Sequence, residues 1–238
     1  MRLYDDLAGW YHLLSPPENH GWEADHYAAL WRGLVDAPRT LLDLGAGGGC
    51  VASHLRRDFA CTLVDRSPAM LDTSRAVNPD CEHVAGDLRD LRLGRTFDGV
   101  LLGDALMYLR GEGELEAAIA TAFAHTRPGG AALFVPDCTR ETFRPGDSHG
   151  GTDTADGARG LRWLQWVRDP DPADDSFTTD WALMLREGDR IEVVHEQHRM
   201  ALLARATYGR LIAAAGFRLI DEPAHAGVLI GTRDRAST

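Results

Sequence analysis

The sequence contains no lysine, since all 25 of its Lys and Arg residues are arginine. Together with abundant Ala and Gly, this bias is typical of a GC-rich genome and indicates no particular site. Positive charge is scarce overall, because 36 Asp and Glu residues leave a formal net charge of −11 and a pI of about 5.3. Nucleic-acid phosphates and anionic membrane surfaces repel such a chain. We therefore expect neither nucleic acid nor membrane among its partners.

Long hydrophobic runs are also missing. The apolar runs are short, such as Gly130 to Pro136, whereas a membrane-spanning helix needs ~20 apolar residues. The first six residues lack the basic and apolar regions of a secretion signal. With 44% hydrophobic residues, a chain of 238 residues can fill one core of ordinary size. These features predict a single cytoplasmic domain.

Cysteine is rare and scattered. The four residues Cys50, Cys61, Cys81 and Cys138 form no Cys-x-x-Cys pair, and buried free thiols are the simplest interpretation. The ten histidines are equally dispersed. The closest two lie three positions apart on an expected strand, which puts their side chains on opposite faces. We expect no metal site.

The first 140 residues alternate between strand-like and helix-like segments. The apolar runs expected to form strands are 40–44, 60–65, 81–85, 97–102 and 131–135. Helices are expected over 51–57, from the Ser67-Pro68 cap onward, and over 112–126, where Arg127-Pro128-Gly129-Gly130 ends the last one. This alternation implies right-handed crossovers and a mostly parallel sheet with helices on both faces, an α/β fold.

The pattern changes after the fifth strand. Residues 141–160 are rich in Gly, Asp, Thr and Pro and are expected to form an exposed loop. Strand-like runs follow at 161–168, 177–186 and 190–200, with short turns that predict an antiparallel meander. A closing helix over 206–215 and strands at 217–220 and 228–230 complete the chain. No linker separates the meander, so it is interpreted as an insertion into one domain.

A glycine-rich segment between the first strand and the next helix is the most informative feature. A dinucleotide-binding turn needs G-x-G-x-x-G, and Cys50 occupies its third glycine position. The loop D-x-G-x-G-x-G of S-adenosylmethionine (SAM) enzymes is matched in full by Asp43, Gly45, Gly47 and Gly49. A carboxylate before the glycines suits a cationic ligand such as SAM better than a phosphate. A glycine turn that binds nothing is the alternative.

Three further sites follow successive strands. Asp65 ends the second strand at the spacing where a carboxylate accepts both hydroxyls of an adenosine ribose, although a helix cap is the simpler role. Asp87 follows the third strand and is placed to accept the adenine amino group, while Leu88 covers the ring. Residues 103–108 follow the fourth strand, at the edge where ligands of open α/β sheets bind.

Taken together, these motifs resemble the class I SAM-dependent methyltransferases over nearly the whole chain. The opening residues Tyr4 to Tyr11 are similar to the N-terminal cover of glycine, sarcosine and amino-sugar N-methyltransferases. Gly48-Gly49-Cys50 departs from the Gly-Thr-Gly of many relatives and keeps the glycine positions. The resemblance implies a single Rossmann-like domain over 1–238 that divides into a helical cover (1–38), a SAM-binding core (39–140), a loop and antiparallel insertion (141–203) and closing elements (204–238).

The resemblance also implies a set of SAM contacts, with Tyr11 reaching the cofactor carboxylate. The residues expected to contact SAM are Tyr11, Asp43, Gly45, Ala46, Gly47, Gly49, Asp65, Arg66, Met70, Gly86, Asp87, Leu88, Gly103, Asp104 and Ala105.

Methyl transfer requires alignment of a nucleophile with the sulfonium methyl group and exclusion of water. An amine has only to be neutral, whereas a hydroxyl gains from a general base. The candidate bases are Asp137 after the fifth strand, His149 in the Gly-rich segment and His198 on the meander. Each has a simpler alternative role. Asp137 would form a turn, His149 would be solvated, and His198 would lie on the sheet surface. Tyr108 is expected to form a wall of the substrate pocket.

Tryptophan and arginine residues of the insertion are relevant to which methyl acceptor the protein would bind. Trp166 is a candidate pocket residue, although the tryptophans of the meander are more simply interpreted as packing against the domain or against the partner in a homodimer. Arg144 and Arg162 would be needed in the pocket for an anionic substrate, because the acidic surface favours cationic or neutral ones.

The main hypothesis is a SAM-dependent methyltransferase acting on an N or O atom of a small metabolite, in secondary metabolism. A SAM-binding enzyme that rearranges or cyclises its substrate without methylating it is the alternative. A nicotinamide-dependent oxidoreductase is disfavoured by Cys50. Protein or nucleic-acid methylation is disfavoured by the absence of a basic patch and of a recognition domain.

Overall fold

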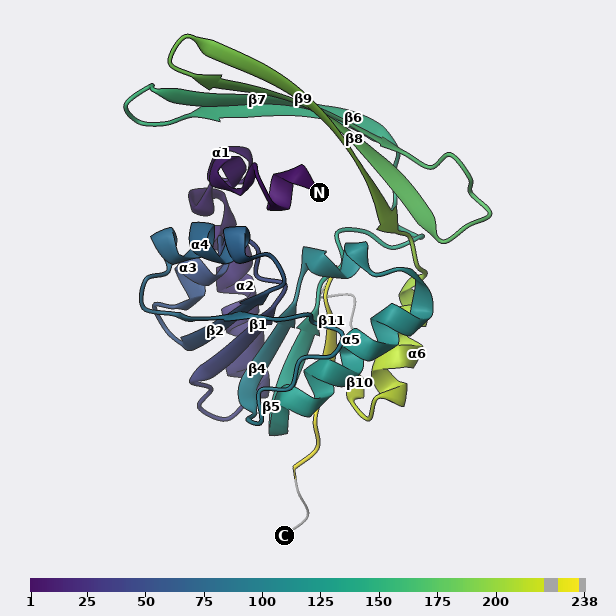
Figure 1. Cartoon of the computed structure of the whole chain (residues 1–238). Coiled ribbons are helices and arrows are strands. Elements are labelled where there is room, and N and C mark those ends of the chain that lie inside the picture. Colours follow the sequence, from purple (N-terminus) through teal and green to yellow (C-terminus); the bar gives the residue numbers. More distant parts are fainter. Residues whose placement is uncertain (221–226, 236–238) are drawn as a thin grey trace.

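The computed structural model describes residues 1–220 and 227–235, and its centre is a seven-stranded sheet of order β3-β2-β1-β4-β5-β11-β10 (Figure 1). The first five strands are mutually parallel, and β11 runs antiparallel to both of its neighbours. This topology confirms the mostly parallel Rossmann-like sheet. The strands are β1 (Thr40–Leu44), β2 (Ala60–Asp65), β3 (Glu82–Ala85), β4 (Phe97–Leu102), β5 (Thr126–Phe134), β10 (Arg218–Ile220) and β11 (Leu229–Thr232).

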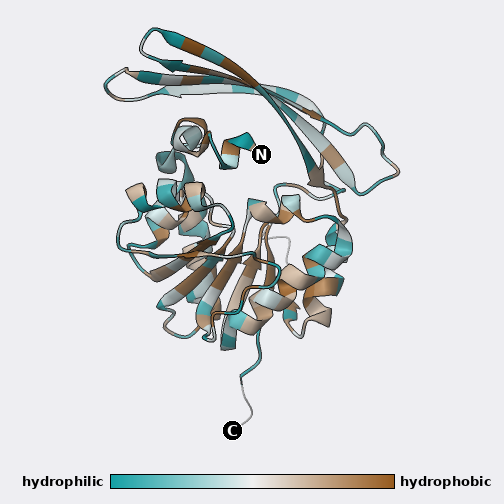
Figure 2. Ribbon diagram, in the orientation of Figure 1, coloured by the Kyte–Doolittle hydropathy of each residue, from teal (hydrophilic) through white to brown (hydrophobic). Residues whose placement is uncertain are grey.

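Helices cover both faces of this sheet because its strands are apolar on both sides. Leu41 of β1 packs with α2 (Gly21–Leu34) and α3 (Ala52–Leu55), whereas Leu42 packs with α5 (Gly111–His125) and α6 (Arg205–Ala214). The hydrophobic residues gather along the strands and the helix faces that meet them (Figure 2). α4 (Pro68–Val77) begins as expected, with the Ser67 hydroxyl accepting the Met70 N–H at 3.2 Å.

A second, four-stranded antiparallel sheet lies beyond the carboxyl ends of the parallel strands (Figure 1). Its strands are β6 (Gly146–Asp153), β7 (Arg159–Arg168), β8 (Ser176–Glu187) and β9 (Arg190–Ala201). The N-terminal segment lies between the two sheets and contains η1 (Arg2–Tyr4), η2 (Ala8–Trp10), α1 (Tyr11–Leu14) and η3 (Pro17–His20). Leu3 and Leu7 are buried there against β7, β8 and β9. The N-terminal segment therefore packs against the antiparallel sheet on one side and covers the carboxyl ends of the parallel strands on the other.

Two local expectations are wrong. The segment 141–160 contains β6, which pairs with β7 over eight positions, so the meander has four strands. β6 is an edge strand with exposed polar side chains on both faces, and such strands carry no hydrophobic alternation. The helix α5 does end before residue 127, as expected, but residues 127–130 already lie inside β5, because the chain enters the strand directly from the helix.

The other boundaries agree with the expected ones to within a few residues. The expected closing segment 204–238 includes positions 221–226 and 236–238, which lie outside the described residues. The division of the domain into four segments stays a prediction. Within residues 1–220 and 227–235, no helix combines the length and apolar character needed to cross a bilayer.

Candidate functional site

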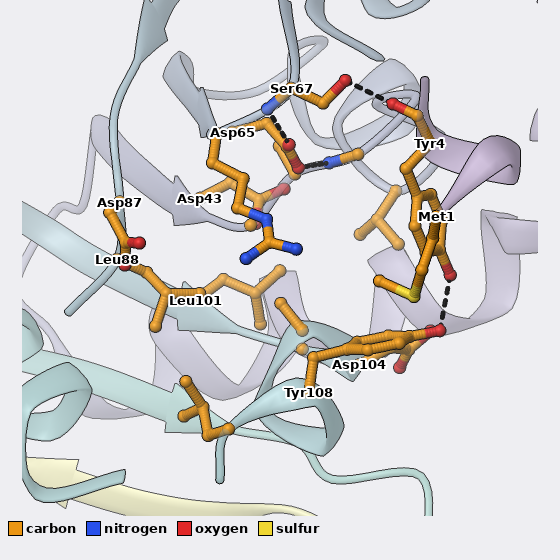
Figure 3. Close-up of a pocket in the computed structure, with 18 of the residues that line it drawn as sticks. Met1, Tyr4, Asp43, Asp65, Ser67, Asp87, Leu88, Leu101, Asp104 and Tyr108 are labelled. Atoms are coloured by element: carbon orange, nitrogen blue, oxygen red, sulfur yellow. Dashed lines mark hydrogen bonds between the residues drawn. The ribbon is translucent and has the colours of Figure 1, made fainter. Parts of the chain in front are cut away.

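A large cavity of about 710 Å³ lies at the carboxyl ends of β1 to β4, under the N-terminal segment (Figure 3). Its walls come from the glycine loop, from the ends of β2 and β3, and from η4 (Asp104–Tyr108) after β4. The position matches the edge where open α/β sheets bind their ligands.

The glycine loop is shaped by close backbone approach. Gly45 has φ +89°, and a Cβ there would lie 2.3 Å from the Cβ of Ala105. The N–H of Gly47 donates to Asp65 Oδ2 at 2.9 Å, which ties the loop to the end of β2. At Gly48 a Cβ would lie 2.5 Å from Tyr11 Cδ1, so the absence of a side chain makes room for the N-terminal segment.

Several carboxyl groups lie near one another in the large cavity. Burial raises the pKa of Asp43 to about 7, and the nearby Asp65 and Asp104 carboxyls contribute to the rise. Glu23 of α2 contributes in the same direction. A site in which carboxylates repel one another in this way favours a cationic ligand, which would lower the pKa again.

One end of the large cavity combines apolar walls with an ion-pair network. Leu88 and Leu101 face the cavity (Figure 3). Arg89 Nε donates to Asp87 Oδ1 at 2.9 Å, and its Nη1 donates to Glu114 at 2.7 Å. The side-chain hydrogen bonds from Arg89 lower the pKa of Asp87, so this carboxylate is ionised and held in place. This end of the cavity therefore combines apolar surface with a fixed carboxylate.

A small cavity of about 400 Å³ adjoins the large one under the antiparallel sheet. It is lined mainly by residues of the N-terminal segment, the insertion and the segment after β5. The two cavities share five lining residues, namely Tyr4, Tyr11, Asp104, Tyr108 and His198. Ligands in the two cavities would therefore meet at this shared wall.

A chain of polar contacts runs along the shared wall. The hydroxyls of Tyr4 and Tyr108 are 2.7 Å apart, and Tyr108 Oη is 2.9 Å from His198 Nδ1. On the far side of the imidazole, Nε2 lies 3.1 Å from Glu196 Oε1. The other carboxylate oxygen of Glu196 accepts the Leu3 N–H at 2.9 Å. The chain therefore joins η1, η4 and β9.

Two carboxyls face the small cavity. Asp104 follows β4 and Asp137 follows β5, and both are among its lining residues. Solvent reaches them through the cavity, yet the surrounding protein removes much of the hydration of Asp137. This burial raises the pKa of Asp137 well above its usual range, and the adjacent Asp104 carboxyl raises it further. A cationic group in the small cavity would lower the pKa of Asp137 again.

The structure brings most of the expected residues together. All expected SAM contacts except Gly49 and Met70 line the large cavity. Gly49 instead packs on α4, where its carbonyl accepts a hydrogen bond from Asn78 at 2.9 Å. Met70 is buried beneath Gly47. Both support the loop without lining the cavity.

The candidate bases and substrate-pocket residues lie in different places. His198, Asp137, Tyr108 and Arg144 line the small cavity. His149 lies on the exposed edge strand β6, outside the residues that line either cavity.

The alternation of β7 decides the orientation of its large side chains. Trp166 is exposed and Trp163, three positions earlier, faces the small cavity together with Trp181. The expectation that Trp166 lines the substrate pocket is therefore wrong, because its side chain points to the opposite face of β7. Arg162 pairs with Asp153 at 2.5 Å on the outer face and lines neither cavity.

Several residues that line the large cavity were not predicted from the sequence. His20, Glu23 and Tyr27 come from η3 and α2 and line the large cavity. His20 Nδ1 lies 2.9 Å from Glu23, whose other oxygen accepts the Tyr27 hydroxyl at 2.8 Å. No motif marks them, and their spacing is that of an ordinary amphipathic helix.

Comparison with known proteins agrees with this geometry. A family model described as a methyltransferase domain matches residues 41–130. A dTDP-3-amino-3,6-dideoxy-alpha-D-glucopyranose N,N-dimethyltransferase of Streptomyces fradiae is 32% identical over 197 residues, which are 82% of this chain and 76% of that relative. The crystal structure of DesVI from Streptomyces venezuelae superposes with a TM-score of 0.80 at 26% identity, covering 90% of this chain and 92% of that one. A SAM-bound amino pentose methyltransferase from Micromonospora echinaspora, involved in calicheamicin biosynthesis, gives a TM-score of 0.75 at 26% identity over 90% of this chain and 91% of that one.

Proposed function

This chain belongs to the class I SAM-dependent methyltransferases of small molecules in secondary metabolism, and from that premise we propose that its acceptor is the amino group of a nucleotide-linked amino sugar. The observation that carries the proposal is the shared wall, at which a cofactor cavity meets an acceptor cavity lined by paired carboxyls. An amino-sugar N,N-dimethyltransferase and an amino pentose methyltransferase among its relatives support the same substrate class.

The large cavity suits SAM, which supplies the methyl group when bound. The repulsion that raises the pKa of Asp43 would be offset by a ligand that carries sulfonium and ammonium charges. Asp65 would accept the ribose hydroxyls while it holds the glycine loop. Asp87 and Leu88 would contact the adenine, and Tyr11 the cofactor carboxylate. The remaining expected contacts in the cavity would complete the site.

The small cavity favours nitrogen over oxygen as the acceptor atom. Asp104 and Asp137 place two carboxyl groups on its wall, and burial together with the adjacent Asp104 carboxyl raises the pKa of Asp137. An ammonium group beside these carboxyls would offset both effects. A hydroxyl acceptor carries no positive charge with which to do so.

The remaining walls suit a sugar linked to a nucleotide. Trp163, Trp181 and Phe143 offer apolar surfaces to a pyranose ring. Arg144 lines the same cavity with an exposed guanidinium, and arginine is well suited to bind a diphosphate. Nucleic acid is not a proposed substrate, since the net charge of −11 opposes it.

Incubation of the purified protein with SAM and dTDP-linked 3-amino sugars tests the proposal. We expect the acceptor to gain one or two methyl groups by mass spectrometry, and the matched 3-hydroxy sugars to gain none. Asp104→Asn should raise KM for the amine, with Arg162→Gln on the outer sheet face as a control that leaves KM unchanged. Methylation of the hydroxy sugar at the rate of the amine would contradict the proposal.

We also propose that the chain forms a homodimer in the cytoplasm. Leu164, Trp166, Met184, Ile191 and Val193 are between 42% and 65% exposed, and they occupy the outer face of the antiparallel sheet. An apolar patch of this kind is typical of an interface. The four free cysteines are typical of a reducing compartment. Sedimentation velocity tests the dimer, and a monomer at every concentration would contradict it, as would a Trp166→Glu variant that remains dimeric.

A further inference from the structure

The polar chain Tyr4–Tyr108–His198–Glu196 connects the shared wall of the two cavities to a buried imidazole. The His198 side chain is only 1% exposed, and its two ring nitrogens have different neighbours. Nδ1 meets the Tyr108 hydroxyl at 2.9 Å and Nε2 lies 3.1 Å from Glu196. Neither Nε2 nor Glu196 Oε1 has a hydrogen-bond partner in good geometry among the described residues.

We propose that Tyr4, Tyr108 and His198 form a proton relay that deprotonates the acceptor amine, with Glu196 as the positioning residue. This inference rests on the proposed amine acceptor. The geometry assigns each step. The ammonium group donates a proton to Tyr4 Oη, the Tyr4 proton passes to Tyr108 Oη, and the Tyr108 proton passes to His198 Nδ1. The relay ends with a neutral amine, two intact phenols and an imidazolium beside the Glu196 carboxylate.

The proton balance of the reaction requires such a group. An ammonium acceptor has no free lone pair, so one N–H bond must break before the C–N bond forms. As that bond forms, the carbon–sulfur bond of the methyl donor breaks and its electron pair stays on sulfur. The methylated product is again a cation, and one proton is released in each turnover. The relay receives that proton in a site covered by the N-terminal segment.

The order of the polar contacts determines which tautomer of His198 the relay needs. Tyr108 donates to Nδ1 only if that nitrogen carries no proton, so the neutral ring must hold its proton on Nε2. The Glu196 carboxylate favours that arrangement, as in other histidine–carboxylate pairs. The hydrogen bond from the Leu3 N–H to Glu196 couples the relay to the N-terminal segment. The chain is therefore complete only when this segment, which also carries Tyr4, is in place.

Charged groups around His198 determine the direction of transfer. Glu196 faces it from β9, Tyr108 and Asp104 from η4, Tyr4 from η1, and Asp137 lies across the small cavity. Burial raises the pKa values of Tyr4 and Tyr108, so neither phenol holds a negative charge. Each phenol must gain one proton as it loses another. The imidazole is the first group in the chain that can retain an added proton.

Single-turnover methylation of a dTDP-linked amino sugar, measured across a range of pH, tests the relay. His198→Gln and Tyr108→Phe should each lower the rate constant by about 10²-fold, which is typical for loss of an acid–base group. Both should also remove from the pH profile the limb that reports titration of the imidazole. Glu196→Gln should shift that limb and retain part of the rate. His195→Gln is the matched control, because His195 lies on the same strand with its side chain 69% exposed on the outer face, and it should leave the profile unchanged.

Nitrogen-15 NMR of the histidine rings provides a readout that does not depend on the acceptor. In the native protein with S-adenosylhomocysteine, the signals lost in His198→Gln should report a neutral ring protonated on Nε2. A ring protonated on Nδ1, or an imidazolium at neutral pH, would overturn the relay. A rate constant that survives His198→Gln would overturn it as well. A native enzyme that methylates no amine would instead refute the proposed function, while NMR would still decide the state of the relay.

Discussion

Replacing Asp43 with asparagine removes a carboxyl that is buried at the end of β1 with Asp65 and Asp104 nearby. The pKa of Asp43 rises from 3.8 to about 7 on folding, first because of burial and then because of these neighbours. Each pKa unit corresponds to about 1.36 kcal/mol, so the ionised carboxyl destabilises the ligand-free fold by up to about 4 kcal/mol.

The sign of this effect depends on pH. The folded state binds the Asp43 proton more tightly than the unfolded state, so the stability of the native protein should fall as pH rises from about 4 to about 7 and then level off. The amide of the Asp43→Asn variant cannot ionise. The variant should therefore match the native protein near pH 4 and become progressively more stable than it toward pH 8, by no more than about 4 kcal/mol.

Urea unfolding followed by tryptophan fluorescence, at several pH values without cofactor, measures this difference. A difference in unfolding free energy that is the same at every pH would refute the assignment of the effect to Asp43 ionisation. The same variant should bind SAM more weakly, because it lacks a negative charge near the cationic ligand. Calorimetric titration at pH 8 checks this second expectation, and an unchanged Kd would contradict it.

Three further substitutions probe the fold and the loop. Hydrogen bonds from Arg39, Thr40 and Arg127 overcome the effect of burial and lower the pKa of Asp98 to about 2. Asp98→Asn should therefore lower the free energy of unfolding by about 2 kcal/mol above pH 4 and leave it unchanged near pH 2, as measured by denaturation. Equal stabilities of the variant and the native protein at pH 7 would contradict this. Asp65→Ala should weaken SAM binding by about 10- to 100-fold in calorimetry, and an unchanged Kd would remove Asp65 from the site. Gly45→Ala should cost about 1–3 kcal/mol of stability because of its positive φ and the 2.3 Å approach to Ala105, and a native unfolding midpoint would refute this.

The strength of the sequence argument differs between regions of the chain. The parallel sheet and its order of motifs were predictable, because each strand is a short apolar run followed by a turn residue or helix cap. β6 was not, because an exposed edge strand pairs through its backbone and places few constraints on its side chains. Trp166 shows a related limit, since one position along β7 decides between the cavity and the outer face.

The class of cofactor was predictable from residue types, because the glycine loop and Asp65 lie within one short stretch of the chain. The surroundings of the acceptor were not, because they are assembled from distant segments. Tyr4 and Tyr108 are 104 positions apart, and Tyr108 and His198 are 90 positions apart. They become neighbours through the packing of the N-terminal segment between two sheets. Local residue types specify turns and strands, whereas contacts between distant segments depend on how whole faces pack. The cofactor loop could therefore be predicted from the sequence, and the relay beside it could not.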